Sequence, residues 1–394
     1  MQKPEPAATL TVAPSLDAFT REEWSRLSGA DPANCRVPYN PFVSYDFLKS
    51  LEESGCAVRE TGWLGQHLRL EDAGGLLIGA VPCNLKSHSQ GEYVFDHGWA
   101  DAFERAGGRY YPKLQVSVPF TPATGPRLLV GGNTDPAAAR QALAQGLKTL
   151  TDRLGVSSAH VTFAPDQDVT ALEEAGFLVR TDQQFHFFNE GYTSYDDFLA
   201  GLASRKRKAL KRERRAALEA GIEIEWLTGS DLTEAVWDDF FTFYMDTGSR
   251  KWGRPYLNRH FFSLIGERMA DDILLVMARR EGRYIAGALN FIGGDALYGR
   301  NWGAIEHHPF LHFEVCYHQA IEFAIARGLK RVEAGAQGEH KLARGYLPVT
   351  TRSAHYIAHP GLRRAVADYL EHERQDVSAI GGILAEHSPY KKGG

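Results

Sequence analysis

The side chains best suited to chemistry lie in the run GAQGEHKLARGYLP, residues 335–348. Glu339 and His340 are the candidate catalytic residues, because an imidazole exchanges protons near neutral pH and an adjacent carboxylate can orient or charge it. The alternative is that both residues cap or brace a turn. The sequence leaves both interpretations open.

Cations and glycines flank this pair. Lys341 and Arg344 are candidate ligands of a substrate phosphate or carboxylate. Arg344 is the better candidate, because its planar guanidinium can bind two oxygens at once. The alternative for both residues is surface charge on a following helix. Gly335 and Gly338 allow a donor to approach the backbone closely, and Gln337 adds an amide. The run therefore predicts a turn that binds the donor substrate and holds an anionic substrate group beside the group that reacts.

The elements on either side of the run predict where it lies in the fold. Residues 313–327 have the apolar spacing of an amphipathic helix, and Gly328 ends it in the left-handed conformation. Residues 329–334 alternate like a strand. A loop that follows a strand of an α/β sheet lies where ligand crevices form, so we expect residues 335–348 to line such a crevice.

Two segments predict three-stranded meanders: residues 64–100, with a long second strand over residues 76–85, and residues 273–304. Polar side chains lie at their ends. Asp96 and His97 are neighbours on a predicted strand, so they point to opposite faces and are not expected to act together. Lys113, in the run RYYPK, is a candidate phosphate ligand or else an exposed loop lysine. Six candidate substrate ligands follow from these segments: Asp96, His97, Lys113, Tyr298, Arg300 and Trp302.

A strongly basic helix is predicted over residues 195–220. Its apolar residues share one stripe, and a cationic face lies opposite. The face is either a solvated surface or a docking surface for the phosphates of RNA or of a nucleotide-linked substrate. Its candidate phosphate ligands are Arg205, Lys208, Arg212 and Arg215.

The two meanders have matching patterns, and each is followed by helix and strand signals, which favours an internal duplication. The fold class is therefore α/β (α+β), with mixed twisted sheets flanked by helices. We expect an N-terminal segment over residues 1–37, a first domain over 38–193 and a basic connecting helix over 194–220. A second domain with a C-terminal helix and tail follows over 221–394.

The composition excludes several classes of protein. The 394 residues carry a net charge of −5, with 43% hydrophobic and 24% charged residues, which is typical of a soluble globular protein. The four cysteines show no CxxC spacing, and no signal core or membrane span is evident. Pro309 places His308 outside the helix that carries His312, so no metal site is predicted. We expect a soluble cytoplasmic protein without a tightly bound cofactor.

Three motifs carry a resemblance to a known family: PKLQVSVPFTP at 112–122, GSRKWGRPY at 248–256, and the 335–348 run. With the basic helix and the two-copy layout, they resemble the FemAB-like bacterial group of predicted N-acyltransferases, over roughly residues 38–375. The resemblance implies tandem domains of the GCN5-related N-acetyltransferase (GNAT) fold. It also implies acyl-CoA or aminoacyl-tRNA as co-substrate, since GNAT enzymes use the former and FemAB enzymes the latter.

The leading hypothesis is an N-acyltransferase that moves an acyl or aminoacyl group to a small-molecule or nucleotide-linked amine. An activated ester or thioester needs mainly alignment, carbonyl polarisation and removal of one proton. One alternative is a tRNA-dependent aminoacyl transferase of the FemAB type, acting on a cell-wall precursor. The other is a noncatalytic protein that uses the same scaffold to bind a ligand or RNA.

Overall fold

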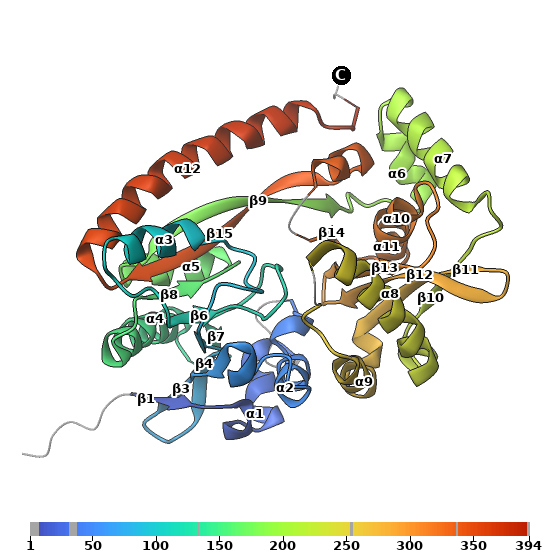
Figure 1. The fold of residues 1–394 in the computed structure, drawn as a ribbon. Helices are drawn as coiled ribbons and strands as arrows, with labels where there is room; N and C mark the ends of the chain where they lie inside the picture. The colour runs from blue at the N-terminus through green and yellow to red at the C-terminus, as the bar shows by residue number, and fades with distance from the viewer. Residues whose placement is uncertain (1–7, 31–37, 133, 253–254, 336–337, 392–394) are drawn as a thin grey trace, which may run out of the picture. The chain divides into compact units, whose positions relative to one another are not determined.

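The computed structural model describes the chain except residues 1–7, 31–37, 133, 253–254, 336–337 and 392–394 (Figure 1). The chain forms two compact units. Unit 1 comprises Met1–Asp182 and Thr351–Ser378, and unit 2 comprises Gln183–Thr350 and Ala379–Gly394. These units differ from the ranges 38–193 and 221–394, because a C-terminal segment returns to unit 1 and the basic helix belongs to unit 2.

Unit 1 contains two sets of strands. The first is an antiparallel sheet in the order β1 (Ala8–Ala13), β3 (His67–Asp72), β4 (Leu77–Val81) and β7 (Leu129–Val130). The second has the order β2 (Trp63–Gly65), β5 (Asn84–Lys86), β6 (Lys113–Val116), β8 (Ser158–Val161) and β15 (Leu347–Ile357, of which 351–357 lie in unit 1). Only β6 and β8 pair in parallel in this second set, and α4 lies between them in the chain, as a parallel crossover requires.

The helices of unit 1 begin and end at ordinary capping signals. In α4, Asp135 caps the first turn by accepting from Ala137 and Ala138, and Gly155 ends the helix with a φ of 64°. Its apolar stripe, which includes Leu143 and Leu147, is buried in the core. The helices are α1 (Arg21–Ser28), α2 (Tyr45–Glu53), α3 (His97–Arg105), α4 (Pro136–Leu154), α5 (Asp166–Glu174) and α12 (Pro360–Glu386), whose last residues belong to unit 2.

Unit 2 is built on an antiparallel meander that continues into a parallel pair. Its strands follow the order β10 (Glu223–Leu227), β11 (Ile273–Arg280), β12 (Arg283–Ile292), β13 (Ala296–Ala304), β14 (Arg331–Glu333) and β9 (Leu178–Phe188, of which 183–188 lie in unit 2). β13 and β14 are parallel, and the other neighbours are antiparallel. The helices are α6 (Tyr195–Gly201), α7 (Ser204–Leu218), α8 (Glu234–Trp252), α9 (Arg259–Arg268), α10 (Leu311–Phe313) and α11 (Gln319–Ala326).

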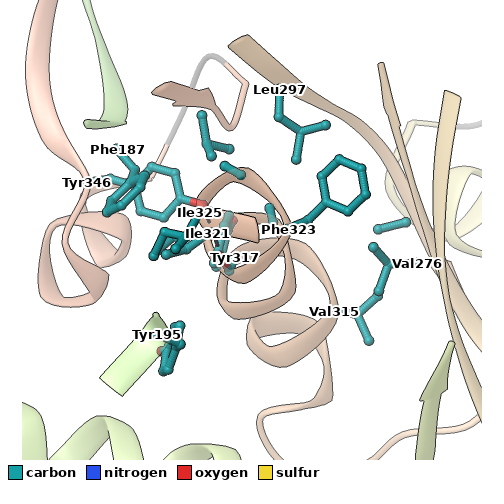
Figure 2. Packing of buried hydrophobic residues seen from close by; sticks show 14 of the residues in the cluster. Phe187, Tyr195, Val276, Leu297, Val315, Tyr317, Ile321, Phe323, Ile325 and Tyr346 are labelled. Carbon is teal, nitrogen blue, oxygen red and sulfur yellow. Dashed lines mark hydrogen bonds between the residues drawn. The ribbon is translucent and has the colours of Figure 1, made fainter. Parts of the chain in front are cut away.

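The core of unit 2 forms around the segment from α10 to α11 (Figure 2). Residues Glu314–His318 between these helices are π-helical, a distortion that often marks functional positions. Ile321 and Phe323 are buried with Leu297 in the same cluster, and full burial of such a side chain contributes about 1.5–3 kcal/mol. Gly328 ends the helix with a φ of 66°, which confirms the predicted boundary.

The second predicted meander is confirmed as β11, β12 and β13, but the first is wrong in two places. Its predicted long strand over residues 76–85 is interrupted at Pro82, which has no N–H for a ladder, and β4 and β5 belong to different sheets. Its predicted last strand is absent, because Asp96 occupies the N-cap of α3 and His97 begins the helix.

Within the described part of the chain, no helix has the length and apolar character to cross a membrane. Nor do three His, Cys, Asp or Glu side chains of the described residues converge as metal ligands. His308 instead lies 2.9 Å from Glu306, and the ring of His312 packs 5.1 Å from that of Trp302.

Candidate functional site

The parallel strands β13 and β14 of unit 2 part after a short contact. They pair only from Ala296 with Arg331 to Tyr298 with Glu333, whereas β13 continues to Ala304. Over residues 299–304, β13 has no strand partner on this side among the described residues. Arg300 is the extra residue of a bulge against β12, and bulges are frequent next to active sites. The N–H of Ala304 at the end of this segment donates to Oγ1 of Thr247 in α8 at 3.2 Å, so part of this backbone already has a partner.

The turn after β14 contains a buried amine. Glu339–Arg344 form a 3-10 helix between Gly338 and Gly345, whose φ angles are 115° and 89°. Lys341 is 2% exposed, and its Nζ donates to the carbonyl of Gly335 at 3.1 Å. Burial lowers the pKa of Lys341 to about 8, because the interior disfavours the charged form. Lys341 has no carboxylate partner among the side chains that the structure describes.

His340 contacts a phenol from the π-helical segment. Its Nε2 lies 3.1 Å from the hydroxyl of Tyr317. Burial, together with the charges of Arg344 and Lys341, lowers the pKa of His340, so the imidazole is neutral near pH 7. Burial raises the pKa of Tyr317, which therefore stays a phenol. A neutral imidazole beside a phenol can accept a proton and pass it on.

Arg344 fixes the turn through several contacts. Its Nε and Nη2 donate to the two carboxylate oxygens of Glu213 at 2.8 and 2.7 Å, and its Nη1 donates to the carbonyl of His340 at 2.7 Å. The guanidinium also stacks 3.4 Å from the ring centre of Phe313. Both Lys341 and Arg344 are buried, so the alternative of exposed surface charge is wrong. The geometry favours Arg344 as a positioning residue.

Glu213 links Arg344 to two further side chains, His318 and Tyr195. Its Oε1 lies 2.8 Å from Nε2 of His318, and Nδ1 of His318 lies 2.6 Å from the hydroxyl of Tyr195. The hydrogen bonds from His318 and Arg344 lower the pKa of Glu213 although burial opposes ionisation. Glu213 is thus an anion that ties α7 to the turn.

The two faces of α7 differ as the sequence predicted. Arg205, Lys208, Arg212 and Arg215 are exposed, and Leu210 and Ala217 are buried. The helix is shorter than predicted, because α6 and α7 are separate on either side of residues 202–203. On the inner side, Arg214 donates to Glu314 and Glu322 at 2.7 and 2.8 Å. Binding of RNA or phosphate by the outer face stays a prediction.

A buried polar row in unit 2 was not predicted from the sequence. The strand register places Tyr298, Glu333 and His186 side by side on β13, β14 and β9. Oε1 of Glu333 accepts from Arg331 at 3.0 Å, whereas its Oε2 has no hydrogen-bond partner and lies 3.8 Å from His186. Burial lowers the pKa of His186. Polar residues at alternate positions of β9, Gln184 and His186, were the available signal.

The structure separates the remaining predicted residues. Lys113 begins β6 and is buried, with Nζ 2.6 Å from Asp96 and 2.7 Å from Glu92; it is therefore neither a loop ligand nor an exposed loop lysine. His97 is exposed on α3 and stacks on Phe95, whereas Asp96 is buried. The expectation that Asp96 and His97 do not act together agrees with this placement, although the reason is a helix rather than a strand.

Other predicted residues belong to β13 or the turn. Tyr298 is buried, and Arg300 and Trp302 are half-buried on the part of β13 that continues past β14. Gly335 and Gly338 have positive φ angles, of 81° and 115°, which are conformations that favour glycine. Gln337 and the side chain of Glu339 lie outside the described residues. Their roles stay predictions.

Comparison with known proteins gives one family and a set of similar folds. A model of the FemAB-like family, described as peptidoglycan biosynthesis/recognition, matches residues 15–392. The solved structure of FemX is 12% identical, with a TM-score of 0.54, and the alignment covers 89% of this chain and 98% of that one. No curated protein gives a significant match.

Two further structures are similar at lower scores. A tandem GNAT protein from the clavulanic acid biosynthesis pathway is 13% identical, with a TM-score of 0.46, over 90% of this chain and 99% of that one. L-PGS from Bacillus licheniformis is 8% identical, with a TM-score of 0.49, over 87% and 96%. At these identities the likeness concerns the fold, which is α/β with tandem GNAT-like domains as expected. Because the family model spans nearly the whole chain, the protein belongs to the FemAB-like family.

Proposed function

We propose that this protein transfers an acyl or aminoacyl group from an activated donor to an amine of a peptidoglycan precursor. The observation that carries the proposal is the buried amine of Lys341, which donates to the carbonyl of Gly335 just after the end of β14. A donor aligned beside this amine would meet a buried cation that has no carboxylate partner among the described side chains, and such a cation can stabilise developing negative charge. The family's description supports peptidoglycan as the pathway.

The residues of the turn divide the chemistry between them. The neutral acceptor amine attacks the donor carbonyl, and a C–N bond forms as the ester or thioester bond breaks. Lys341, whose pKa of about 8 keeps it mostly protonated at pH 7, donates to the oxyanion of the tetrahedral intermediate. His340 takes the proton that the attacking nitrogen loses, and Tyr317 can relay it. The leaving oxygen or sulfur receives a proton in turn.

The remaining charged groups position this machinery. Arg344 holds the carbonyl of His340 and both oxygens of Glu213, which fixes the turn against α7. Glu339 stays a candidate partner of His340 in proton transfer. Arg300 and Trp302 are candidate acceptor ligands on β13.

The outer face of α7 favours aminoacyl-tRNA over acyl-CoA as the donor. Four cations, Arg205, Lys208, Arg212 and Arg215, are exposed on a single helix, and its inner residue Glu213 binds the turn through Arg344. A polyanion that docks on α7 would thus lie against the element that positions the reactive residues. Acyl-CoA is the second candidate donor, and neither is expected to bind as a permanent cofactor.

Native mass spectrometry of freshly purified protein identifies the donor. We expect retained tRNA at low salt that dissociates as salt rises. Replacing the four exposed cations of α7 with glutamine should abolish this retention. Retained coenzyme A without RNA would assign the donor to the thioester class, and a nucleotide-linked precursor would identify the acceptor.

A further inference from the structure

Residues 388–391, which follow helix α12, belong to unit 2. The chain between them and the turn that contains Lys341 passes through unit 1, to which it contributes Thr351–Ser378. The segment is fixed to the junction of α6 and α7 by backbone contacts, so the backbone of Tyr390 is held in place independently of its side chain. These contacts are the bridge of Leu202 with Tyr390, the bond from the Ala203 N–H to the Pro389 carbonyl at 3.0 Å, and the bond from the Lys391 N–H to the Gly201 carbonyl at 3.1 Å.

The side chain of Tyr390 reaches the turn. Its hydroxyl donates to the carbonyl of Gly345 at 2.9 Å, and Gly345 is the residue that ends the 3-10 helix Glu339–Arg344. Its ring packs 6.4 Å from that of Phe198 in α6. Burial raises the pKa of Tyr390, so the phenol keeps its proton and remains a donor.

Gly345 is closely enclosed at this contact. Its φ of 89° lies in the left-handed region, which favours glycine. A Cβ at this position would lie 2.7 Å from Cζ of Phe198 and 3.2 Å from the hydroxyl oxygen of Tyr390. The end of the turn therefore packs directly against these two aromatic side chains, which leave little room for it to shift.

The short helix that carries the reactive residues is thus held at its C-terminal end by two elements. Arg344 donates two hydrogen bonds to Glu213 of α7, and Gly345 accepts the hydrogen bond from Tyr390. A misplacement of about 1 Å in a reactive group can lower a rate by about 10²-fold. A contact that fixes the end of this helix therefore matters for the groups that the helix carries.

We propose that Tyr390 is a positioning residue for the transfer reaction, whose hydroxyl fixes the end of the turn through the carbonyl of Gly345. The inference rests on the proposed function for its effect on turnover. The order of the turn itself can be measured without transfer, by hydrogen exchange of the two amides that close it. The Gly345 N–H donates to the Leu342 carbonyl at 3.1 Å, and the Tyr346 N–H donates to the Lys341 carbonyl at 3.3 Å.

Tyr390→Phe tests the proposal, because it keeps the ring and the backbone contacts and removes only the hydroxyl. Exchange of the Gly345 and Tyr346 amides should become about three- to tenfold faster. In the transfer assay, kcat should fall by a similar factor while KM stays close to that of the parent.

Tyr284→Phe is the matched control, since it also removes a phenol hydroxyl of unit 2, one that donates to Glu225 at 2.6 Å. We expect parent-like exchange in the turn and parent-like kcat in this variant. The Tm of Tyr390→Phe should fall by no more than that of the control, which separates a local effect on the turn from a general loss of stability.

Three results would overturn the proposal. The first is parent-like exchange of both amides in folded Tyr390→Phe, and the second is unchanged kcat in that variant of an active protein. The third is an equal change in Tyr284→Phe, which would indicate a general loosening of unit 2. Faster exchange in Tyr390→Phe of a protein that transfers nothing would reject the proposed function and leave the positioning of the turn by Tyr390 standing.

Discussion

Units 1 and 2 each contain a buried lysine, and the two lysines differ in their partners. Lys113 of unit 1 lies between Glu92 and Asp96. Their attraction outweighs burial and raises the pKa of Lys113. Lys341 of unit 2 contacts a backbone carbonyl, and burial lowers its pKa to about 8. Burial alone therefore does not make a lysine reactive, since nearby carboxylates decide whether its charge is neutralised.

The histidines of the two units show a similar difference. His160 of unit 1 is fully enclosed, and burial lowers its pKa to about 3, so it stays neutral at any physiological pH. His340 of unit 2 is exposed at its edge and contacts Tyr317. Only the second can exchange a proton with a substrate. We therefore expect acid–base chemistry in unit 2.

The largest expected effect concerns stability in unit 1. Lys113→Met leaves the buried carboxylates of Glu92 and Asp96 without their nearest cation, so we expect a loss of about 3–5 kcal/mol in the free energy of unfolding. Lys341→Met removes a buried cation that has no carboxylate, and should cost less than about 1 kcal/mol at pH 7. Urea denaturation of both variants measures the contrast. Equal losses would contradict the assignment of different roles to the two lysines.

The next effect concerns turnover in unit 2. Without the Lys341 ammonium, the oxyanion loses a donor, and kcat for Lys341→Met should fall roughly 10²–10³-fold while KM changes little. Lys330→Met, which changes an exposed lysine of the same unit, is the matched control. A fall in both variants would point to a general loss of fold or solubility.

His340 is expected to have a somewhat smaller effect. His340→Ala removes the proton acceptor and should lower kcat about 100-fold, with the bound fraction of substrate unchanged. Tyr317→Phe should have a milder effect, because the imidazole can still release its proton to water. Turnover close to that of the parent in folded His340→Ala, Glu339→Gln would rule out side-chain proton transfer by this pair.

The pH dependence of stability distinguishes the two lysines further. The pKa of Lys341 is lowered in the folded protein from its ordinary value of 10.5 to about 8, so the unfolded chain binds more protons between these values. The free energy of unfolding should therefore rise with pH from about 8 to 10.5, by at most about 1.4 kcal/mol per pH unit. Lys341→Met should lack this rise. A rise that persists in the variant would assign it to another group.

The smallest effect on stability is expected on α7. Replacing Arg205, Lys208, Arg212 and Arg215 with glutamine should change the free energy of unfolding by less than about 0.5 kcal/mol, since all four are exposed. The salt dependence of tRNA binding should nevertheless fall, by up to roughly three in the slope of log K against log salt. Glutamine at the exposed residues Arg26, Arg59, Arg105 and Arg153 of unit 1 is the control. An equal fall there would indicate nonspecific binding.

Local patterns predicted much of unit 2. The alternation and turn residues of 273–304 defined three strands, and the helical spacing of α7 separated its outer cations from Leu210 and Ala217. The run at 335–348 was correctly singled out as a turn after a strand. What the sequence could not show is which cation receives a carboxylate, because Glu213 is 131 positions away from Arg344.

A buried polar strand face in unit 1 shows a second limit of sequence reasoning. Alternating residues such as Lys113, Gln115 and Ser117 are typical of a strand with one solvent-exposed face, and only the tertiary structure shows that this face is buried. The break between β4 and β5 was also missed, although Pro82 marked it. In both cases long-range packing, rather than local preference, decided the outcome.

The most direct test of the central claim is transfer of a labelled acyl group to an amine. The protein would be incubated with a peptidoglycan precursor that carries a free amine, and with tRNA charged with labelled amino acids or, separately, labelled acetyl-CoA. We predict that the parent and Lys330→Met move label from the tRNA to the precursor and that Lys341→Met does not. Absence of transfer from both donors, or undiminished transfer by folded Lys341→Met, would contradict the assignment of transfer chemistry to the turn of unit 2.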